Sequence, residues 1–153
     1  WSGCVSVGNE ASLGGALYVS HGDASLEDAV FEADKVPAGA AVYAVEAAVT
    51  AINCTFLAGP TAAAAADLDM LAVQVGAELS SFQAVGCVFS GWRGEAAVSV
   101  EGTLALDACD FRGSSPASGH LVVSSNSSAV PAAVIRNALV GDDNYAAVAG
   151  YYG

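Results

Sequence analysis

The sequence predicts an all-β protein, a right-handed parallel β-helix (solenoid) of about five turns, from an internal repeat, recurring short strands and composition. The repeat is a Cys-x-Phe core with a glycine soon after, which begins at Cys54, Cys87 and Cys109. Weaker copies begin at Ala29 and Asn137, so that the steps from copy to copy are 25, 33, 22 and 28 residues. Recurrence at this length is typical of solenoids, whose stacked repeats bury a continuous core.

Composition favours one strand-rich domain over residues 1–153. Apolar residues make up 54% of the chain, which is enough for a sizeable core, whereas only 13% of residues are charged. Together with 17 glycines, this balance suits stacked strands with tight turns better than a helical bundle with charged outer faces. We expect the domain to be a fragment of a longer chain or one unit of an assembly.

The charge balance argues against two classes of partner. Four Lys and Arg residues against 16 Asp and Glu residues give a formal net charge of −12, which repels phosphate backbones and anionic headgroups. Acidic residues also interrupt the longest apolar stretches, which would need about 18 to 20 residues to cross a bilayer. We therefore expect no nucleic-acid binding and no membrane insertion.

Each repeat is predicted to hold three short strands. The first strand is rich in β-branched residues and occupies one slot in successive units, at 15–19, 41–46, 71–75, 96–100 and 120–124. The second is an apolar pair before each strong core, at Val49 and Ala51, Phe82 and Ala84, and Leu104 and Leu106. The Cys-x-Phe core is the third strand, and Cys4 begins an incomplete first copy.

Two segments also allow a helix. Residues 24–35 carry both helical and strand spacing, and the alignment with the repeat favours strand. The longest step contains an insertion near residues 60–69, with a run of alanines, which we interpret as a longer loop or a short helix. A helix over 62–79 is the competing interpretation. The main alternative to the solenoid is a mixed α/β domain that uses the Ala-rich segments as helices.

The Cys-x-Phe spacing also predicts the core. Residues i and i+2 of a strand face the same side, so the Cys and Phe of each core point inward together. Stacking of equivalent strands then gives an internal ladder of Phe31, Phe56, Phe89, Phe111 and Leu139. A second ladder lies beside it, formed by Ala29, Cys54, Cys87, Cys109 and Asn137.

The segments 14–19 and 52–56 carry a family resemblance. Gly14-Gly15-Ala16-Leu17 followed by Asn53-Cys54-Thr55-Phe56 resembles the repeats of right-handed parallel β-helix (pectin-lyase-like) proteins. It is most similar to the GGA(I/L/V) and FxxN repeats of polymorphic outer-membrane and related cell-surface proteins. The resemblance implies a β-helix at a cell surface. Enzymes of this architecture cut acidic polysaccharides with clustered carboxylates, often with calcium and an arginine.

Candidate sites are few. The nearest approximation to a carboxylate cluster is Glu95, Glu101, Asp107 and Asp110 with Arg93 and Arg112. His21 and His120 show no triad spacing and are expected at the surface. Trp1, Trp92, Tyr145, Tyr151 and Tyr152 are candidates for stacking on sugars or on a neighbouring subunit. We expect no metal site and no cofactor, because the cysteines lack Cys-x-x-Cys spacing.

The cysteines and two asparagines are candidates for covalent modification. Cys54 with Cys87, or Cys87 with Cys109, could form a disulfide, but buried thiols are favoured because Cys packs as a small hydrophobe. Asn53 and Asn126 each begin an N-glycosylation acceptor pattern, which indicates an extracellular or cell-surface protein.

The expected function is that of a non-catalytic structural or adhesive module of an extracellular assembly. A polysaccharide lyase or glycoside hydrolase is the alternative. The expected partners are other chains, or further turns of the same chain, that stack on the open ends of the solenoid. Carbohydrate is a further candidate ligand.

Overall fold

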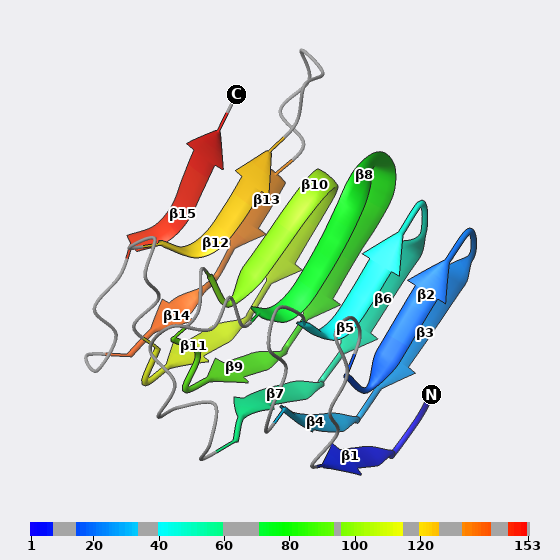
Figure 1. The fold of residues 1–153 in the computed structure, drawn as a ribbon. Coiled ribbons are helices and arrows are strands. Elements are labelled where there is room, and N and C mark those ends of the chain that lie inside the picture. The colour runs from blue at the N-terminus through cyan, green and yellow to red at the C-terminus, as the bar shows by residue number, and fades with distance from the viewer. Residues whose placement is uncertain are drawn as a thin grey trace.

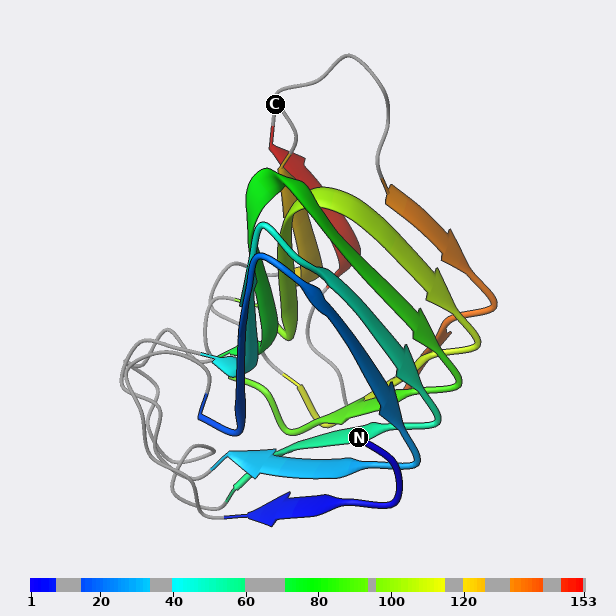
Figure 2. The ribbon, with the colours of Figure 1, turned by 90° about the vertical axis from the view of Figure 1, so that its right-hand side faces the viewer.

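The computed structural model coils the chain into parallel strands that stack along one axis (Figure 1). It describes residues 1–7, 15–33, 40–59, 71–93, 96–114, 120–125, 133–141 and 147–152. Every regular element in these ranges is a strand. Within the same ranges, no helix is long and apolar enough to cross a membrane. Seen along the axis, three walls of strands enclose a triangular interior (Figure 2).

The first wall carries the predicted first strand of each repeat. It consists of β2 (Leu17–Ser20), β5 (Ala40–Val45), the first part of β8 (Leu71–Val85), the first part of β10 (Val98–Asp107), β12 (His120–Ser125) and β15 (Ala147–Tyr152). Parallel pairing places one inward row across the wall, formed by Leu17, Val42, Val73, Val98 and Val122. The predicted equivalence of these segments is therefore confirmed.

The second wall carries the predicted apolar pairs. It consists of β3 (Asp23–Glu27), β6 (Ala48–Ile52), the second parts of β8 and β10, and β13 (Ala133–Arg136). Its register aligns Val49 with Phe82 and Phe82 with Leu104. Two residues further along the same strands, Ala51, Ala84 and Leu106 align in the same way.

The third wall carries the Cys-x-Phe cores. It consists of β1 (Val5–Val7), β4 (Val30–Ala33), β7 (Thr55–Ala58), β9 (Val88–Ser90), β11 (Asp110–Arg112) and β14 (Leu139–Val140). Successive phenylalanine rings stack with centroids 5.0 to 5.2 Å apart and planes within 13° of parallel, from Phe31 through Phe56 and Phe89 to Phe111. All four rings are buried.

The ladder does not extend to Leu139. The structure pairs Phe111 with Val140, whereas Leu139 pairs with Asp110 and points outward, with 66% of its surface exposed. The predicted alignment of the last copy was therefore wrong by one residue, and a slip of one residue moves every side chain of a strand to the other face. Ala138, not Asn137, takes the position of Cys109, because the N–H of Leu139 bonds to the Cys109 carbonyl at 2.8 Å.

A left-handed residue turns the chain between the second and third walls in each repeat. Asp28, Asn53, Gly86, Ala108 and Asn137 all have φ between 51° and 63°. Asp, Asn and Gly tolerate this conformation, whereas alanine is strained in it. The same device recurs between the first and second walls, at His21, Glu46, Ala77 and Gly102.

The helical alternatives are wrong wherever the structure describes them. Residues 24–33 form β3 and β4 around a tight corner, and residues 71–79 lie in strand β8. The predicted longer loop near 60–69 lies outside the described residues. The body of the solenoid is about four turns long, from β2 to β11, and β12 to β15 continue its walls. The expected count of about five included the C-terminal copy, whose third-wall strand β14 has only two residues.

Candidate functional site

Two of the carboxylates expected to form an acid–base cluster, Glu101 and Asp107, lie at opposite ends of the second part of β10. Glu101 is at the bend between the first and second walls, where its Oε2 accepts a hydrogen bond from the N–H of Ala77 at 3.1 Å. Asp107 lies at the far end of β10, six residues away, which is about 20 Å along a strand. Two carboxylates of a glycosidase lie about 5 to 9.5 Å apart, so Glu101 and Asp107 do not form such a pair.

Of the remaining members of the expected cluster, the structure brings Asp110 and Arg112 together. Asp107 Oδ1 accepts a hydrogen bond from Asn137 Nδ2 at 2.8 Å. Asp110 lies beyond the next corner, on the outer face of the third wall, and forms an ion pair with Arg112, whose Nε donates to Asp110 Oδ2 at 2.7 Å. Arg93 is exposed. Glu95 lies outside the part of the chain that the structure describes.

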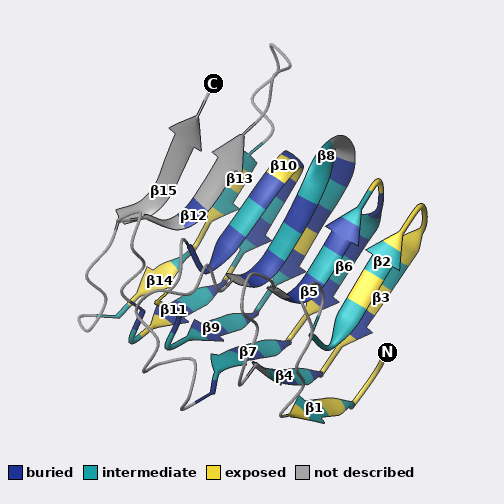
Figure 3. Ribbon diagram, in the orientation of Figure 1, coloured by how far each residue is buried: buried dark blue, intermediate teal, exposed yellow. Residues whose placement is uncertain are grey.

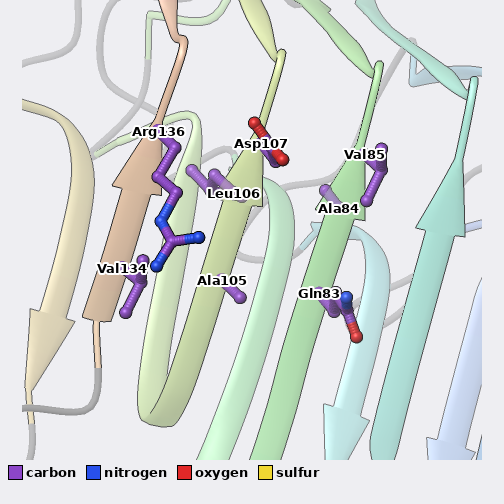
Figure 4. A pocket seen from close by; sticks show the side chains of 8 residues that line it. All are labelled: Gln83, Ala84, Val85, Ala105, Leu106, Asp107, Val134 and Arg136. Atoms are coloured by element: carbon purple, nitrogen blue, oxygen red, sulfur yellow. The ribbon is translucent and has the colours of Figure 1, made fainter.

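A shallow groove of about 290 Å³ lies on the outer face of the second wall (Figure 4). Its floor is the small side chain of Ala105, flanked by Gln83 of β8 and Val134 of β13. Asp107 and Arg136 lie at one end of the groove, and the Arg136 side chain extends along it. These groups can donate and accept hydrogen bonds, but the lining contains no nucleophile beside a base. Sequence reasoning missed the groove, because Gln83, Ala105 and Arg136 share no motif.

The three cysteines of the third-wall corner are buried thiols, as predicted. Each points its sulfur toward backbone carbonyls, and the Cys87 thiol donates to Ala51 O at 3.5 Å. The neighbouring thiols of Cys109 and Cys54, and then burial, raise the pKa of Cys87. Cys87 is therefore a packed, protonated group and not a nucleophile. Among the described residues, no group of three or more His, Cys, Asp or Glu residues is arranged to hold a metal ion.

The glycosylation candidates differ in what the structure describes. Asn53 is exposed at its corner with φ 52°, and its side chain leans over Gly86 of the next turn. The following residues of its acceptor pattern, Cys54 and Thr55, are buried and half-buried. Asn126 lies in a segment that the structure leaves undescribed.

The aromatic and histidine candidates separate into core and surface. Trp92 is fully buried and its Nε1 donates to Phe56 O at 3.2 Å, so the expectation that it stacks on sugars is wrong. His21 is exposed, as expected, with Nε2 at 2.7 Å from the Glu46 carboxylate. Trp1 is exposed at the N-terminal end. No side chain is described for His120, Tyr145, Tyr151 or Tyr152.

Exposed apolar side chains gather at the two ends of the solenoid, as the exposed parts of β1 and β14 show (Figure 3). Val5 and Val7 lie on β1, the first strand of the third wall, and Leu139 and Val140 lie on β14, its last strand. The middle turns between them are closed by pairing on both sides. Within the described surface, the two ends therefore carry the most exposed apolar side chains.

Comparisons with known proteins give no match: no family model, no curated protein and no solved structure resembles this chain significantly. The function must be argued from the solenoid and its surfaces alone.

Proposed function

We propose that this chain is a non-catalytic structural or adhesive module of an extracellular or cell-surface assembly. In this proposal other protein chains, or further turns of the same chain, cover the ends of the solenoid. The observation that carries it is the concentration of exposed apolar side chains on the two end strands of the third wall, β1 and β14. Open strand edges with apolar side chains promote pairing with another chain.

The distribution of polar groups supports a structural role. The inward rows are filled by side chains packed between turns, with Phe, Val, Leu, Ala and Cys predominating. Three described carboxylates are engaged in local contacts, Glu101 with the N–H of Ala77, Asp107 with Asn137 and Asp110 with Arg112. Asn53, which is exposed and begins an N-glycosylation acceptor pattern, supports an extracellular location.

The competing function is cleavage of acidic polysaccharides. The test incubates the protein with polygalacturonate, alginate or hyaluronate, with and without calcium, and measures new reducing ends and the ultraviolet absorbance of unsaturated products. We expect no depolymerisation above a heat-denatured control. Depolymerisation that is lost in Asp107→Asn or Arg112→Gln but kept in the distant Glu27→Gln would contradict the structural proposal.

A further inference from the structure

We infer that the open C-terminal end binds the N-terminal end of a second copy of this chain, head to tail, so that β1 of one copy continues the third wall after β14 of the other. This inference rests on the proposed function and names the partner that covers the ends. Three observations carry it: equivalent exposed residues at opposite edges, complementary offsets of the walls, and opposite charges in one row.

The two most exposed of the large apolar residues that the structure describes occupy equivalent positions at opposite ends. Val5 is 70% exposed on β1, and Leu139 is 66% exposed on β14. The third-wall register connects them through one outward row, Val5, Val30, Thr55, Val88, Asp110 and Leu139. A second copy added in the same register therefore places its Val5 beside Leu139, and each residue covers the other.

The inward row continues across the same junction. Ser6 of the second copy comes to lie on Val140, which follows Phe111 in the ladder row. Among the described strands, β1 pairs with β4 and β14 pairs with β11, and neither has a second described strand on its other side. Pairing of these edges forms main-chain hydrogen bonds of the kind that hold the solenoid together.

The offsets of the walls are complementary. At the N-terminal end the third wall begins one strand early, with β1, whereas the first wall begins at β2. At the C-terminal end the first wall continues one strand further, with β15. Figure 1 shows β1 at one end of the solenoid and β15 at the other. In a head-to-tail pair, β1 of the second copy covers β14 of the first copy. At the same junction, β15 of the first copy covers β2 of the second copy. On the second wall, Ser2 pairs with Glu27, so Trp1 and Ser2 begin the strand that would cover β13.

Charge favours the same register. The outward row of the second wall runs from Glu27 at one end, through Ile52, Val85 and Asp107, to Arg136 at the other. Head-to-tail stacking places Ser2 of the second copy between Arg136 and that copy's Glu27. Their backbones are then two strand spacings apart, about 9.6 Å, a separation that long side chains of opposite sign can bridge over a serine.

Disulfide trapping tests the register directly. In a Cys4→Ser background, Val5→Cys and Leu139→Cys are combined, because equivalent residues on adjacent parallel strands lie within disulfide reach. Mild oxidation of the 153-residue chain should give a series of linked dimers and higher oligomers. The matched control combines Val5→Cys with Val134→Cys, which is also exposed at the C-terminal end but lies on the second wall. Equal cross-linking in the control would overturn the inferred register.

Sedimentation velocity supplies an independent measurement. We expect the unmodified chain to associate as its concentration rises, and Leu139→Lys to weaken association by about tenfold or more, because the ammonium group would be buried beside Val5. Ile52→Lys, which changes an exposed residue of a middle turn, should alter association less than about twofold. A chain that stays monomeric at every concentration would overturn the inference. The polysaccharide assay tests the proposed function separately, because that function survives if other chains or further turns cover the ends.

Discussion

The phenylalanines of the third wall show how one residue type sets the repeat. Each buried ring has a stacked neighbour at about 5 Å, and Phe89 has one on both sides, Phe56 and Phe111. Offset aromatic contacts add about 0.5 to 1.5 kcal/mol to the free energy gained by burying the rings. A ring in the middle of the ladder should therefore contribute more to stability than any outward residue of the same strand.

Replacing Phe89 with Ala should lower the free energy of unfolding by about 3 to 5 kcal/mol, because it opens a cavity between two rings that cannot close over it. Val88→Ala, on the half-buried outer face of the same strand, is the control and should cost less than about 1.5 kcal/mol. Urea denaturation followed by the buried Trp92 measures both changes. Similar losses for the two variants would contradict the inward ladder.

Ala108 is strained where its equivalents in other turns are Asn53, Gly86 and Asn137. Its φ is 51°, a conformation that costs an L-residue about 1 to 2 kcal/mol. Ala108→Gly relieves this strain in the folded state but increases the conformational entropy of the unfolded chain. The net effect should be a free energy of unfolding that is higher by about 0.5 to 1 kcal/mol. Ala105→Gly, inside β10, should instead lower it by about 0.5 to 1 kcal/mol. Two changes of the same sign would be inconsistent with a left-handed corner at Ala108.

Thiol labelling tests the state of the cysteine ladder. Cys4 is half-buried at the N-terminal end, whereas Cys54, Cys87 and Cys109 are fully buried. Because the pKa of Cys87 is raised, little thiolate forms there at pH values around neutrality. Mass spectrometry after treatment with a maleimide should show labelling of Cys4 first and of Cys87 only after unfolding. Labelling of Cys87 as fast as Cys4 in the folded protein would rule out a buried ladder.

At the scale of the element, the long strands β8 and β10 each serve two walls by bending. Gly102 makes the bend in β10 with φ 135°, and a Cβ atom there would lie 2.3 Å from the carbonyl oxygen of Ser80. The neighbouring backbone cannot move away cheaply, because Ser80 is itself buried, with its hydroxyl bonded to Gly76 O at 2.7 Å.

Gly102→Ala should therefore lower the free energy of unfolding by about 3 kcal/mol or more, from the contact and the strained φ together. Gly22→Ala is the matched control, because a Cβ atom at Gly22 meets no atom within 4 Å. The midpoint of urea denaturation compares the two. A Gly102→Ala variant as stable as Gly22→Ala would show that β10 does not bend at this residue.

The elements also show what sequence reasoning could and could not reach. The Cys-x-Phe cores predicted three rungs of the third wall and their inward side, because alternation in a strand assigns faces once one residue is fixed. The last rung was misplaced at Leu139. The prediction placed Asn137 at the position equivalent to Cys54. In the structure Asn137 is equivalent to Asn53, the residue that precedes Cys54. A left-handed corner favours asparagine, and that signal would have set the register.

The surface features were not predictable in the same way. The groove around Ala105 depends on which of three neighbouring strands carries the smallest outward residue. Gln83 and Arg136 are 53 residues apart in the sequence, so the sequence does not indicate that they line the same groove. The expected carboxylate cluster failed for a related reason. Glu101 and Asp107 are close in sequence, but an extended strand separates them by nearly the width of a wall.

At the scale of the whole molecule, a solenoid is stabilised by contacts between neighbouring turns. The stability of each turn then depends on whether it has a neighbour on both sides. Among the described strands, those of the middle turns have two neighbours, whereas β1 and β14 have one, and these two strands carry the most exposed of the large apolar residues. A partner that covers an end should stabilise the solenoid in proportion to the logarithm of its concentration.

Amide hydrogen exchange at two protein concentrations tests most directly the central claim that the solenoid closes its middle turns by itself and leaves its ends for partners. We predict the slowest exchange in β7, β9 and the second part of β10, and fast exchange in β1 and β14 at low concentration. Raising the concentration should slow exchange in β1 and β14 together and leave the middle strands unchanged. Equal, concentration-independent protection from β1 to β14 would contradict the account.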